Sequence, residues 1–589
     1  MKRNSSKPFR ANRRALSAGI ASALALAAPA AFAAPNVWPV QNCNDTGAGS
    51  LREILTAPTT LSGDTVDLSA RTDCVNSTIS LQLGEITVVQ DSLTILGPGS
   101  DKLTIDGTNL PYGNTYQDNS RLLTHTGAGT LDIHGLTLSG GHIYHTGNGY
   151  KALGGCLYSA KDVVLESVDV RNCSAQSQQG AAYGGGVYAK GSATLDNVTL
   201  FGNTAAGSSA RGGGIAAIGK VTATDGLTKK NAAISAGIVL GGGIFGRAGV
   251  SLDGTAVVQN NGISSATFAT GGGIYTRYDL TLKRATISGN AAKMSDGGNA
   301  SAGSGGAFSF FGPVSISYST IAGNAANGIP LSSLAGALGT LGDFRMDHST
   351  VSGNTTTGSI GAIFKTENCG GCTQTFYMRN STVSGNHADL TVGGVDIGST
   401  QQIKLLNSTI AFNTAGKGQG GGPGNYFPLG AGLDIYAGKP ASVSIHSMLI
   451  SNNTYGPGNI ESDFTTAGPQ AVTFGDGPSN SLIRQTSVAN LPSGVTTGVC
   501  PLLGPLRDNG GLTKSHALSS TSPAIDAGDN VIVGIGSIIN LNDQRGSQMG
   551  NGTATYLRVS GLLPDIGAYE VQQDDEIHSS GFDGCPDMP

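Results

Sequence analysis

One polar position of a repeated segment collects the side chains that could carry acid–base chemistry. Twelve residues into successive copies of that segment the chain has Glu166, Asp196, Thr224, Asp253, Lys283, Ser317 and Asp347. If the copies stack as strands, Glu166 and Asp196 lie about 5 Å apart, which suits either the carboxylate pair of a retaining glycosidase or a calcium site. The competing interpretation is a solvated, outward-facing strand position, and the Thr, Lys and Ser residues at this position favour it. Glu166 and Asp196 are the only catalytic candidates, and calcium is the one cofactor that they suggest.

The copies are marked by a glycine-rich triplet and a closing asparagine. They begin 25 to 38 residues apart, at Gly154, Gly184, Gly212, Gly241, Gly271, Gly305, Ala335, Ile360, Val392 and Gly430. In the first seven copies the asparagine follows 18 or 19 residues later, at Asn172, Asn203, Asn231, Asn260, Asn290, Asn324 and Asn354. Glycine permits a sharp turn, and asparagine tolerates the left-handed conformation while its amide can bond the neighbouring copy. Both features predict a structural ladder at the corners of a stack and no role in catalysis.

Apolar and polar residues alternate in three short runs of each copy, as half-buried strands require. In the copy at Gly271, Ile274 lies in the first run, Leu280 and Leu282 in the second, and Ile287 in the third. Other copies repeat these columns, and Phe308 occupies the column of Ile274. A repeat of this length without helical periodicity indicates a solenoid, and three strands per coil fit a parallel β-helix.

The N-terminus has the pattern of a secretory signal. In residues 1–33 six basic residues precede an Ala- and Leu-rich run that ends in Ala31-Phe32-Ala33. Arg13-Arg14 leaves the general and twin-arginine export routes both open. Loss of six basic and no acidic residues changes the formal net charge from −5 to −11. The chain is acidic and has no basic stripe, so we do not expect it to bind nucleic acid. No stretch after the signal is apolar enough to span a membrane as a helix.

The cysteines form an even set, which in an exported chain favours disulfides over reduced thiols or zinc. They are Cys43, Cys74, Cys156, Cys173, Cys369, Cys372, Cys500 and Cys585. We expect pairing between cysteines that are near in sequence. Cys369 and Cys372 have the spacing of a redox motif but lie in an insertion, because Asn386 follows Ile360 by 26 residues in place of 19. We therefore interpret them as a clasp on an extra loop.

In contrast to the 19-residue spacing of most copies, the connection from each asparagine to the next triplet varies from 6 to 17 residues. Loops on a rigid scaffold commonly carry binding functions. This edge, including residues 291–304 and 414–429, is the candidate surface for a glycan or a protein, and its neutral composition offers little general acid or base. The nearby histidines at 125, 134, 142 and 145 fit no metal-ligand spacing, so we interpret them as loop or outward-strand residues.

Two blocks outside the repeats resemble known bacterial families. Residues 43–55, CNDTGAGSLREIL, resemble the leader motif of secreted repeat proteins named after the letters CSLREA. Within this block Ser50 and Glu53 form a capping box, which predicts a short helix over the first coil. Residues 503–530, LGPLRDNGGLTKSHALSSTSPAIDAGDN, with NDQRG at 542 and PDIGAYE at 564, resemble the choice-of-anchor Q domain of bacterial surface proteins. The GGGIY and SGN repeats are similar to those of polymorphic outer-membrane proteins. The resemblance implies a right-handed parallel β-helix, export and attachment to a cell surface, and it implies no reaction.

These observations predict an all-β chain with a helical cap before the β-helix and a capping domain after it. The expected segments are a signal at 1–33, a cap at 34–85, repeats at 86–460, an irregular or terminal coil at 461–499, a choice-of-anchor Q-like cap at 500–571 and an acidic tail at 572–589. Opposite charges in the C-terminal block, Asp543 and Arg545 among them, are expected to pair. We favour a non-catalytic, surface-associated scaffold for adhesion and leave its oligomeric state open. A polysaccharide lyase or glycoside hydrolase is the first alternative, and a structural surface-layer protein is the second.

Overall fold

A computed structural model describes residues 34–110, 118–329, 333–367, 373–416, 430–475, 477–529, 542–547, 555–572, 575 and 585. The chain separates into two compact units, Met1–Pro35 and Asn36–Pro589. The predicted signal at 1–33 lies outside the described residues, so the fold below is that of the second unit.

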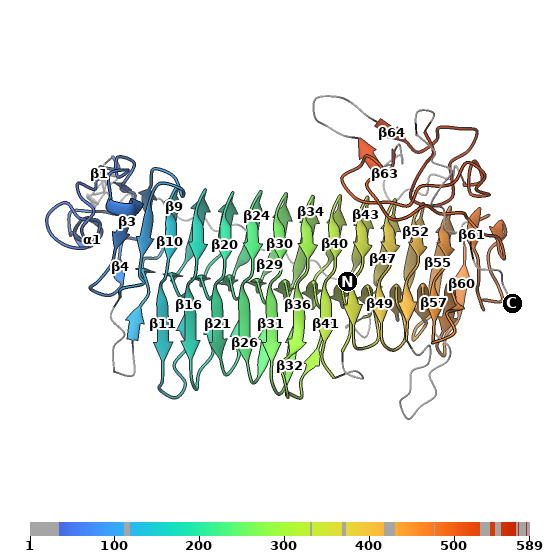
Figure 1. The fold of residues 1–589 in the computed structure, drawn as a ribbon, viewed down its shortest axis with the longest axis horizontal. Coiled ribbons are helices and arrows are strands. Elements are labelled where there is room, and N and C mark those ends of the chain that lie inside the picture. Colours follow the sequence, from blue (N-terminus) through green and yellow to red (C-terminus); the bar gives the residue numbers. More distant parts are fainter. Residues whose placement is uncertain are drawn as a thin grey trace, which may run out of the picture. The chain divides into compact units, whose positions relative to one another are not determined.

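Successive coils stack their short strands into long sheets that run side by side (Figure 1). Sheet A has 15 strands from β1 (Val37–Pro39) to β60 (Val472–Phe474), and sheet B has 15 from β3 (Thr78–Ser80) to β62 (Val495–Thr496). Sheet C has 13 from β4 (Ile86–Val88) to β59 (Phe464–Ala467), and sheet D has 13 from β7 (Asp118–Ser120) to β58 (Ile460–Glu461). A shorter sheet E has six, from β12 (Ala152–Leu153) to β37 (Ser301–Ala302). Pairing within these sheets is parallel except for β7 and β58, the terminal strands of sheet D. The predicted parallel β-helix is confirmed.

One coil shows how the repeat is used. Its strands are β13 (Leu157–Ser159) in sheet C, β14 (Asp162–Glu166) in sheet A, β15 (Asp169–Arg171) in sheet B, β16 (Ser174–Ser177) in sheet D and β17 (Ala182–Tyr183) in sheet E. The three runs predicted from the sequence correspond to sheets C, A and B. The coil has four strands, or five where sheet E is present, because small Ala, Ser and Gly residues in sheets D and E give no hydrophobic alternation to recognise.

The interior is filled by aligned columns of apolar side chains. Ile274, Leu280, Leu282 and Ile287 are all fully buried, at 0 % exposure. Ile274 in β33 (Ile274–Thr276) pairs directly with Ile244 in the preceding coil, so like residues stack on like residues. Each such burial contributes roughly 1.5–3 kcal/mol, which makes these columns the main source of stability.

The position predicted for Phe308 is wrong. Ala307, not Phe308, pairs with Ile274, because Ser304 rather than Gly305 takes the place of Gly271 in that coil. The shift of one residue turns the Phe308 ring to the other face of the strand. There it stacks on Tyr275, with ring centroids 6.0 Å apart.

Side-chain amides form a hydrogen-bonded ladder at the corner between sheets B and D. Each donates its backbone N–H and its Nδ2 to Oδ1 of the next, as Asn260 does to Asn290 at 2.9 Å for both bonds. The ladder comprises Asn203, Asn231, Asn260, Asn290, Asn324, Asn354, Asn386, Asn413 and Asn453. Its last acceptor is Asp463.

Asn172 is outside this ladder, contrary to the prediction. Its side chain is exposed and its φ is +55°. Cys173 occupies the ladder position, where its backbone N–H donates to Oδ1 of Asn203 at 3.0 Å. The one-residue difference in spacing, 18 instead of 19, therefore moves the asparagine from the interior to the surface.

The predicted N-terminal helix is present as α1 (Leu51–Thr56). Oγ of Ser50 accepts the backbone N–H of Glu53 at 3.2 Å, and Oε2 of Glu53 accepts the backbone N–H of Gly49 at 3.2 Å. Leu51 and Leu55 are buried at 0 % exposure in the same apolar cluster as the first coils. The helix thus covers the apolar layer that the first coils would otherwise expose.

The C-terminal segment packs on the outer face of sheet B, and Figure 1 shows it lying over the later coils. Oγ1 of Thr382 donates to Oε1 of Gln544 at 2.5 Å, in β63 (Asn542–Ser547), which pairs with β64 (Thr555–Leu557). The expected charge pairing occurs, since Arg545 contacts Asp543 at 2.8 Å. The buried guanidinium of Arg545 also lies between two rings, those of Tyr556 and Tyr569, 4.0 and 4.1 Å from their centroids.

Three disulfides join Cys43 to Cys74, Cys156 to Cys173 and Cys500 to Cys585. The first two link cysteines 31 and 17 residues apart, as expected, whereas the third spans 85 residues. Cys369 and Cys372 lie outside the described residues. Within the described part of the chain, no helix is long and apolar enough to cross a membrane.

Candidate functional site

The predicted carboxylate pair lies on the outer face of sheet A. Glu166 in β14 and Asp196 in β19 (Ala193–Asp196) are direct cross-strand neighbours, and both are exposed. Oε2 of Glu166 lies 3.2 Å from Nδ1 of His134. Thr224 follows Asp196 in the next strand. The two carboxylates therefore stand together on an open strand face, without walls that would exclude water from a reaction.

The histidines that are near in sequence belong to different sheets. His125 is fully buried in sheet C, where Nδ1 lies 2.8 Å from Oγ of Ser159. His134 lies in sheet A, and His142 and His145 lie in β11 (His142–His145) of sheet D. His134 and His142 face outward as expected, whereas His125 and His145 are buried. The structure does not bring them together as a metal site.

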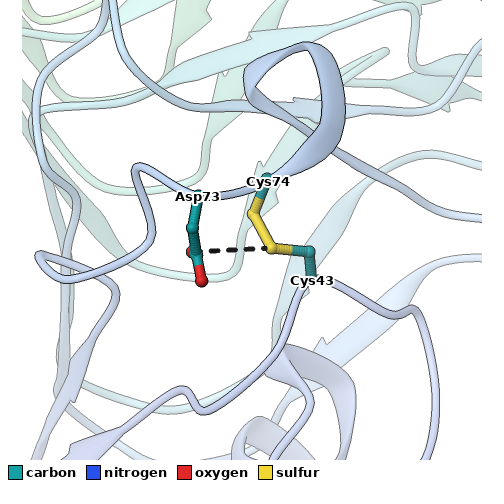
Figure 2. A group of neighbouring side chains, drawn as sticks. All are labelled: Cys43, Asp73 and Cys74. Atoms are coloured by element: carbon teal, nitrogen blue, oxygen red, sulfur yellow. Dashed lines mark hydrogen bonds between the residues drawn. A yellow bond between two sulfur atoms is a disulfide. The ribbon is translucent and has the colours of Figure 1, made fainter.

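One group of metal-ligating residue types does converge, and it consists of Cys43, Asp73 and Cys74 (Figure 2). Figure 2 shows that the two sulfur atoms are bonded to each other, with the Asp73 carboxylate beside them. Cysteine binds a metal ion as a thiolate, and the sulfur atoms of a disulfide are not thiolates. This group is therefore a covalent clasp of the N-terminal cap.

Charge is distributed unevenly along the outer face of sheet A. In the earlier coils it is acidic at Asp132, Glu166 and Asp196. In the middle Asp253 contacts Lys283 at 3.0 Å and Arg284 at 2.6 Å. The later coils present Arg345, Arg379 and Lys404 on the same face.

A groove of about 360 Å³ lies in this basic part of the face. It crosses β39 (Val314–Ser317), β43 (Phe344–Asp347), β47 (Thr375–Arg379) and β51 (Gln402–Leu406). One residue of each strand stands in line along its floor, in the order Ser315, Arg345, Tyr377, Lys404. Since neighbouring strands are about 4.8 Å apart, the four positions span roughly 15 Å along the stack.

Arg345 and Tyr377 form the centre of the groove. The guanidinium carbon of Arg345 lies 4.8 Å from the centroid of the Tyr377 ring. Tyr377 is only 7 % exposed, and this burial raises the pKa of its hydroxyl. Among the described residues, neither Arg345 nor Lys404 forms an ion pair. The stacked guanidinium is therefore held in place while its N–H groups remain available to an anionic ligand.

The nearby carboxylates are engaged with protein donors. Asp343 accepts the backbone N–H of Thr375 at 2.8 Å at one end of the strands. At the other end Asp347 contacts both Arg379 and His348. Burial by itself would raise the pKa of Asp347, but hydrogen bonds from His348 and Arg379 outweigh it and hold that pKa well below its usual range. Both oxygens of Asp347 are therefore engaged by protein groups, whereas Asp343 is exposed and only its Oδ1 is engaged.

The sequence columns did not identify this groove. Arg345 stands ten residues after Ala335, but Tyr377 stands 17 after Ile360 and Lys404 stands 12 after Val392. Insertions in the turns before β47 and β51 displace the two side chains from a fixed offset. The alternating runs TFYMR and QIKLL carry the signal, because their apolar residues define which side chains face outward.

A second group that the sequence did not reveal is a pair of acids on sheet C. Asp396 in β50 (Val395–Gly398) and Asp434 in β54 (Leu433–Tyr436) are cross-strand neighbours. Asp434 is 2 % exposed and accepts a hydrogen bond from Oγ1 of Thr465 at 2.5 Å. Burial raises the pKa of both carboxyls, that of Asp434 to about 6. Asp434 is buried away from solvent, whereas Asp396 is half-buried.

The predicted interaction edge contains sheets D and E rather than irregular loops alone. Residues 291–304 include β36 (Ala291–Met294) and β37. Most of 414–429 lies outside the described residues, which include only β53 (Thr414–Ala415) and the residue that follows it. The edge is thus partly a regular sheet face.

Comparisons with known proteins add little to this geometry. No protein-family model matches the sequence, and no curated protein matches it. The structure is similar to a crystal structure of pectate lyase Pel9A, with 16 % sequence identity and a TM-score of 0.23, over 92 % of this chain and 97 % of that chain. The strand pairing described above, and not this similarity, defines the fold.

Proposed function

We propose that this chain is an exported β-helical scaffold that binds polysaccharides bearing carboxylate groups in the groove of sheet A, without cleaving them. The observation that carries the proposal is the stacking of Arg345 on Tyr377 beside Lys404. A guanidinium presents a planar fork that matches a carboxylate, and stacking on a ring fixes its orientation before the ligand arrives. Lys404 supplies a second cation, two coils beyond Arg345 and one beyond Tyr377.

The direction of the groove favours an elongated ligand. Its four aligned positions come from four successive coils, so a ligand that meets all of them lies along the stack rather than across it. A polymer of uronic acids repeats its carboxylates along an extended chain. Such a polymer can meet Arg345 and Lys404 together, and the two weak contacts then reinforce each other.

The arrangement supports binding rather than cleavage. Cleavage of such a polymer needs a base near the reacting carbon. Of the two nearest carboxylates, Asp343 accepts a hydrogen bond from Thr375, and Asp347 is paired with Arg379 and His348. Burial raises the pKa of Tyr377, which makes its hydroxyl a poor base at neutral pH. The proposed role is therefore adhesion.

An extracellular, surface-held location accords with this role. Three disulfides are typical of an oxidising compartment. The segment at 500–571 that resembles a choice-of-anchor Q domain packs on the later coils, and Cys500–Cys585 holds residue 585 of the tail to it. We infer that this region, which covers the outer face of sheet B in the later coils, retains the protein at a cell surface.

The test uses the mature chain, a polyuronate and the methyl ester of the same polymer. We expect binding to the polyuronate only, weakened at least about tenfold in Arg345→Ala/Lys404→Ala, which corresponds to about 1.4 kcal/mol. The matched control is Lys283→Ala/Arg284→Ala, which removes the same charge from the same face outside the groove. Equal binding of the acid and ester forms, or equal loss in both variants, would refute the proposal.

The alternative is a lyase that uses the same groove, and Arg345 with Lys404 is the observation that favours it. Two cations beside a substrate carboxylate could also stabilise the charge that develops when the adjacent C–H proton is removed. The two functions differ in product. New unsaturated chain ends, followed by ultraviolet absorbance during the same incubation and lost in the groove variant, would establish the lyase in place of the scaffold.

A further inference from the structure

The outer face of sheet D carries a second hollow, separate from the groove of sheet A. It has a volume of about 540 Å³ and extends from β11 across β16, β21 (Thr204–Gly207) and β26 (Ala232–Ser235) to β31 (Asn261–Ser264). These strands lie next to one another in the lower row of Figure 1. With strands about 4.8 Å apart, the hollow is roughly 20 Å long.

The hollow exists because β21 has small residues where its neighbours have large ones. The outward column reads Tyr144, Gln176, Ala206, Ile234 and Ile263 through successive strands. Ala206 therefore leaves a depression between Gln176 on one side and Ile234 on the other. Gly207 extends it, and a Cβ at that position would lie 2.6 Å from the carbonyl oxygen of Gly180, so the turn beside it leaves no room for a side chain.

The two ends of the hollow are formed by different kinds of side chain. At one end the Tyr144 hydroxyl accepts a hydrogen bond from Nε2 of Gln178 at 2.5 Å, and the Tyr144 ring stacks on His142 with centroids 6.2 Å apart. At the other end lie Ile263 and Ser295, and Ile234 beside Ile263 is 38 % exposed. Between the ends the lining combines the amides and hydroxyls of Gln and Ser residues with small Ala and Gly residues, and no charged residue is among the described residues that line it.

This lining selects one class of ligand. An anionic polymer would find no cation among the lining residues, the next one in the column being Lys293, one strand beyond Ile263. An extended peptide would find no main-chain partners because the β21 backbone already pairs with strands on both sides. A sugar hydroxyl both donates and accepts hydrogen bonds, as amides and hydroxyls of the lining do, and the C–H face of a pyranose packs on a ring or a branched aliphatic side chain.

We propose that the hollow on sheet D binds an extended, uncharged polysaccharide, which lies along the stack between Tyr144 and Ile263. This site is independent of the acidic-polymer groove on sheet A. The scaffold then has two carbohydrate sites on different faces, one selective for charge and the other for neutral hydroxyl-rich chains. Such a protein could hold two different polymers of one matrix together.

The test fills the depression without touching the core. Ala206→Phe places a ring in the hollow from an outward, half-buried position, and Thr204→Phe makes the same change on the same strand and face outside the lining. Binding is measured by calorimetry with uncharged hexasaccharides of β-glucan, xylan and mannan type. We expect the wild type and Thr204→Phe to bind at least one of them and Ala206→Phe to bind it at least tenfold more weakly, with polyuronate binding unchanged in all three.

Two results would overturn the proposal, and a third calls for a second variant that decides it. Wild-type protein that binds none of the uncharged oligosaccharides at millimolar concentration has no such site. Equal binding by Ala206→Phe and Thr204→Phe places the ligand elsewhere. Loss of polyuronate binding in Ala206→Phe would show that the substitution disturbs the whole scaffold. Ala206→Gln, which fills the hollow with a side chain of the type at Gln176, then decides. The site is rejected if Ala206→Gln does not selectively weaken binding of the uncharged oligosaccharides.

Discussion

Asp463 accepts two hydrogen bonds from Asn453 on one carboxylate oxygen, from the backbone N–H at 3.0 Å and from Nδ2 at 2.8 Å. Its other oxygen accepts the backbone N–H of Gln485 at 2.9 Å. Each ladder asparagine donates its backbone N–H and one Nδ2 bond to the next member, and a further Nδ2 bond to a carbonyl of the preceding coil. The last residue has no further amide to which it could donate, and it accepts from both Asn453 and Gln485. An asparagine at 463 would turn an NH2 group toward a backbone N–H, which explains why the ladder ends in an aspartate.

The ladder should contribute strongly to stability because its members are buried. Asn290→Ala removes the acceptor of two hydrogen bonds from Asn260, which leaves the buried backbone N–H of Asn260 unsatisfied, and it also removes the donor to the Val257 carbonyl. We expect the free energy of unfolding to fall by about 3 kcal/mol. Urea denaturation monitored by circular dichroism measures the change.

Asn172→Ala is the matched control, because Asn172 is exposed and outside the ladder. We expect the free energy of unfolding of this variant to fall by only about 1 kcal/mol, because alanine adopts the left-handed conformation less readily than asparagine. A loss in Asn290→Ala no larger than that in Asn172→Ala would mean that water replaces the missing amide, and the ladder would then be incidental to stability.

The acids on sheet C should make stability depend on pH. Burial raises the pKa of Asp434 to about 6, from an ordinary 3.8 in the unfolded chain. Between pH about 4 and 6 the unfolded state loses a proton that the folded state keeps, so the free energy of unfolding falls as pH rises through this window. The shift of about two units corresponds to about 3 kcal/mol.

Asp434→Asn keeps a carbonyl acceptor for Thr465 and removes the titration of Asp434, while Asp396 still titrates with a pKa that burial raises. We expect its apparent Tm at pH 7.5 to exceed that of the wild type, with no difference at pH 3.5, at one fixed scan rate. Glu570, whose pKa burial raises from 4.5 to about 8, also lowers the free energy of unfolding as pH rises from about 4.5 to 8, and this contribution is the same in the variant and the wild type. A variant that loses as much stability as the wild type between pH 4 and 6 would contradict this assignment.

The fork geometry of Arg345 should matter beyond its charge. Arg345→Lys retains the cation but loses the planar group that stacks on Tyr377. We expect polyuronate binding to weaken about threefold to tenfold in this variant, and more in Arg345→Ala. Titration calorimetry in low salt separates the two, since screening at high ionic strength reduces both affinities. Unchanged affinity in Arg345→Lys would reduce the role of this residue to that of a point charge.

Much of the fold could be predicted from the sequence because the interior columns repeat. Ile274, Leu280 and Ile287 mark three sheets by apolar alternation alone. Sheet D was not predicted, because strands such as Ser174–Ser177 bury small residues, and small residues give no hydrophobic pattern in the sequence. The predictions for Asn172 and Phe308 were each wrong by one residue in register, and such an error exchanges the inward and outward faces of a strand or corner.

The candidate site was less accessible to such reasoning than the fold. Glu166 and Asp196 were correctly placed side by side, because strand register follows from the repeat. The groove depends on Tyr377 and Lys404, which insertions move out of the repeat offset. Its chemistry also depends on stacking and on the pairing of Asp347 with Arg379, and such contacts are not encoded in spacing.

The disulfide between Cys156 and Cys173 occupies places that the other coils fill with glycine and asparagine. Gly186 stands in line with Cys156, and Asn203 stands in line with Cys173. The backbone N–H of Gly141, which an asparagine at 173 would receive, points to the sulfur of Cys156 at 3.2 Å. The carbonyl of Leu138 is placed as that of Val170 is for Nδ2 of Asn203. The disulfide therefore stands in for one rung of the ladder.

Cys156→Gly/Cys173→Asn should consequently restore the rung. Loss of the crosslink in Cys156→Ala/Cys173→Ala costs about 3 kcal/mol for a loop of this length, with a sequence separation of 17 residues. The Gly/Asn pair loses the same crosslink but gives Gly141 an acceptor and Leu138 a donor, so we expect it to be about 1–3 kcal/mol more stable than the Ala/Ala pair. Urea denaturation of both variants measures the difference directly. Equal stability of the two would show that the first coil cannot accommodate an amide, and that the crosslink is required there because the ladder cannot begin any earlier than Asn203.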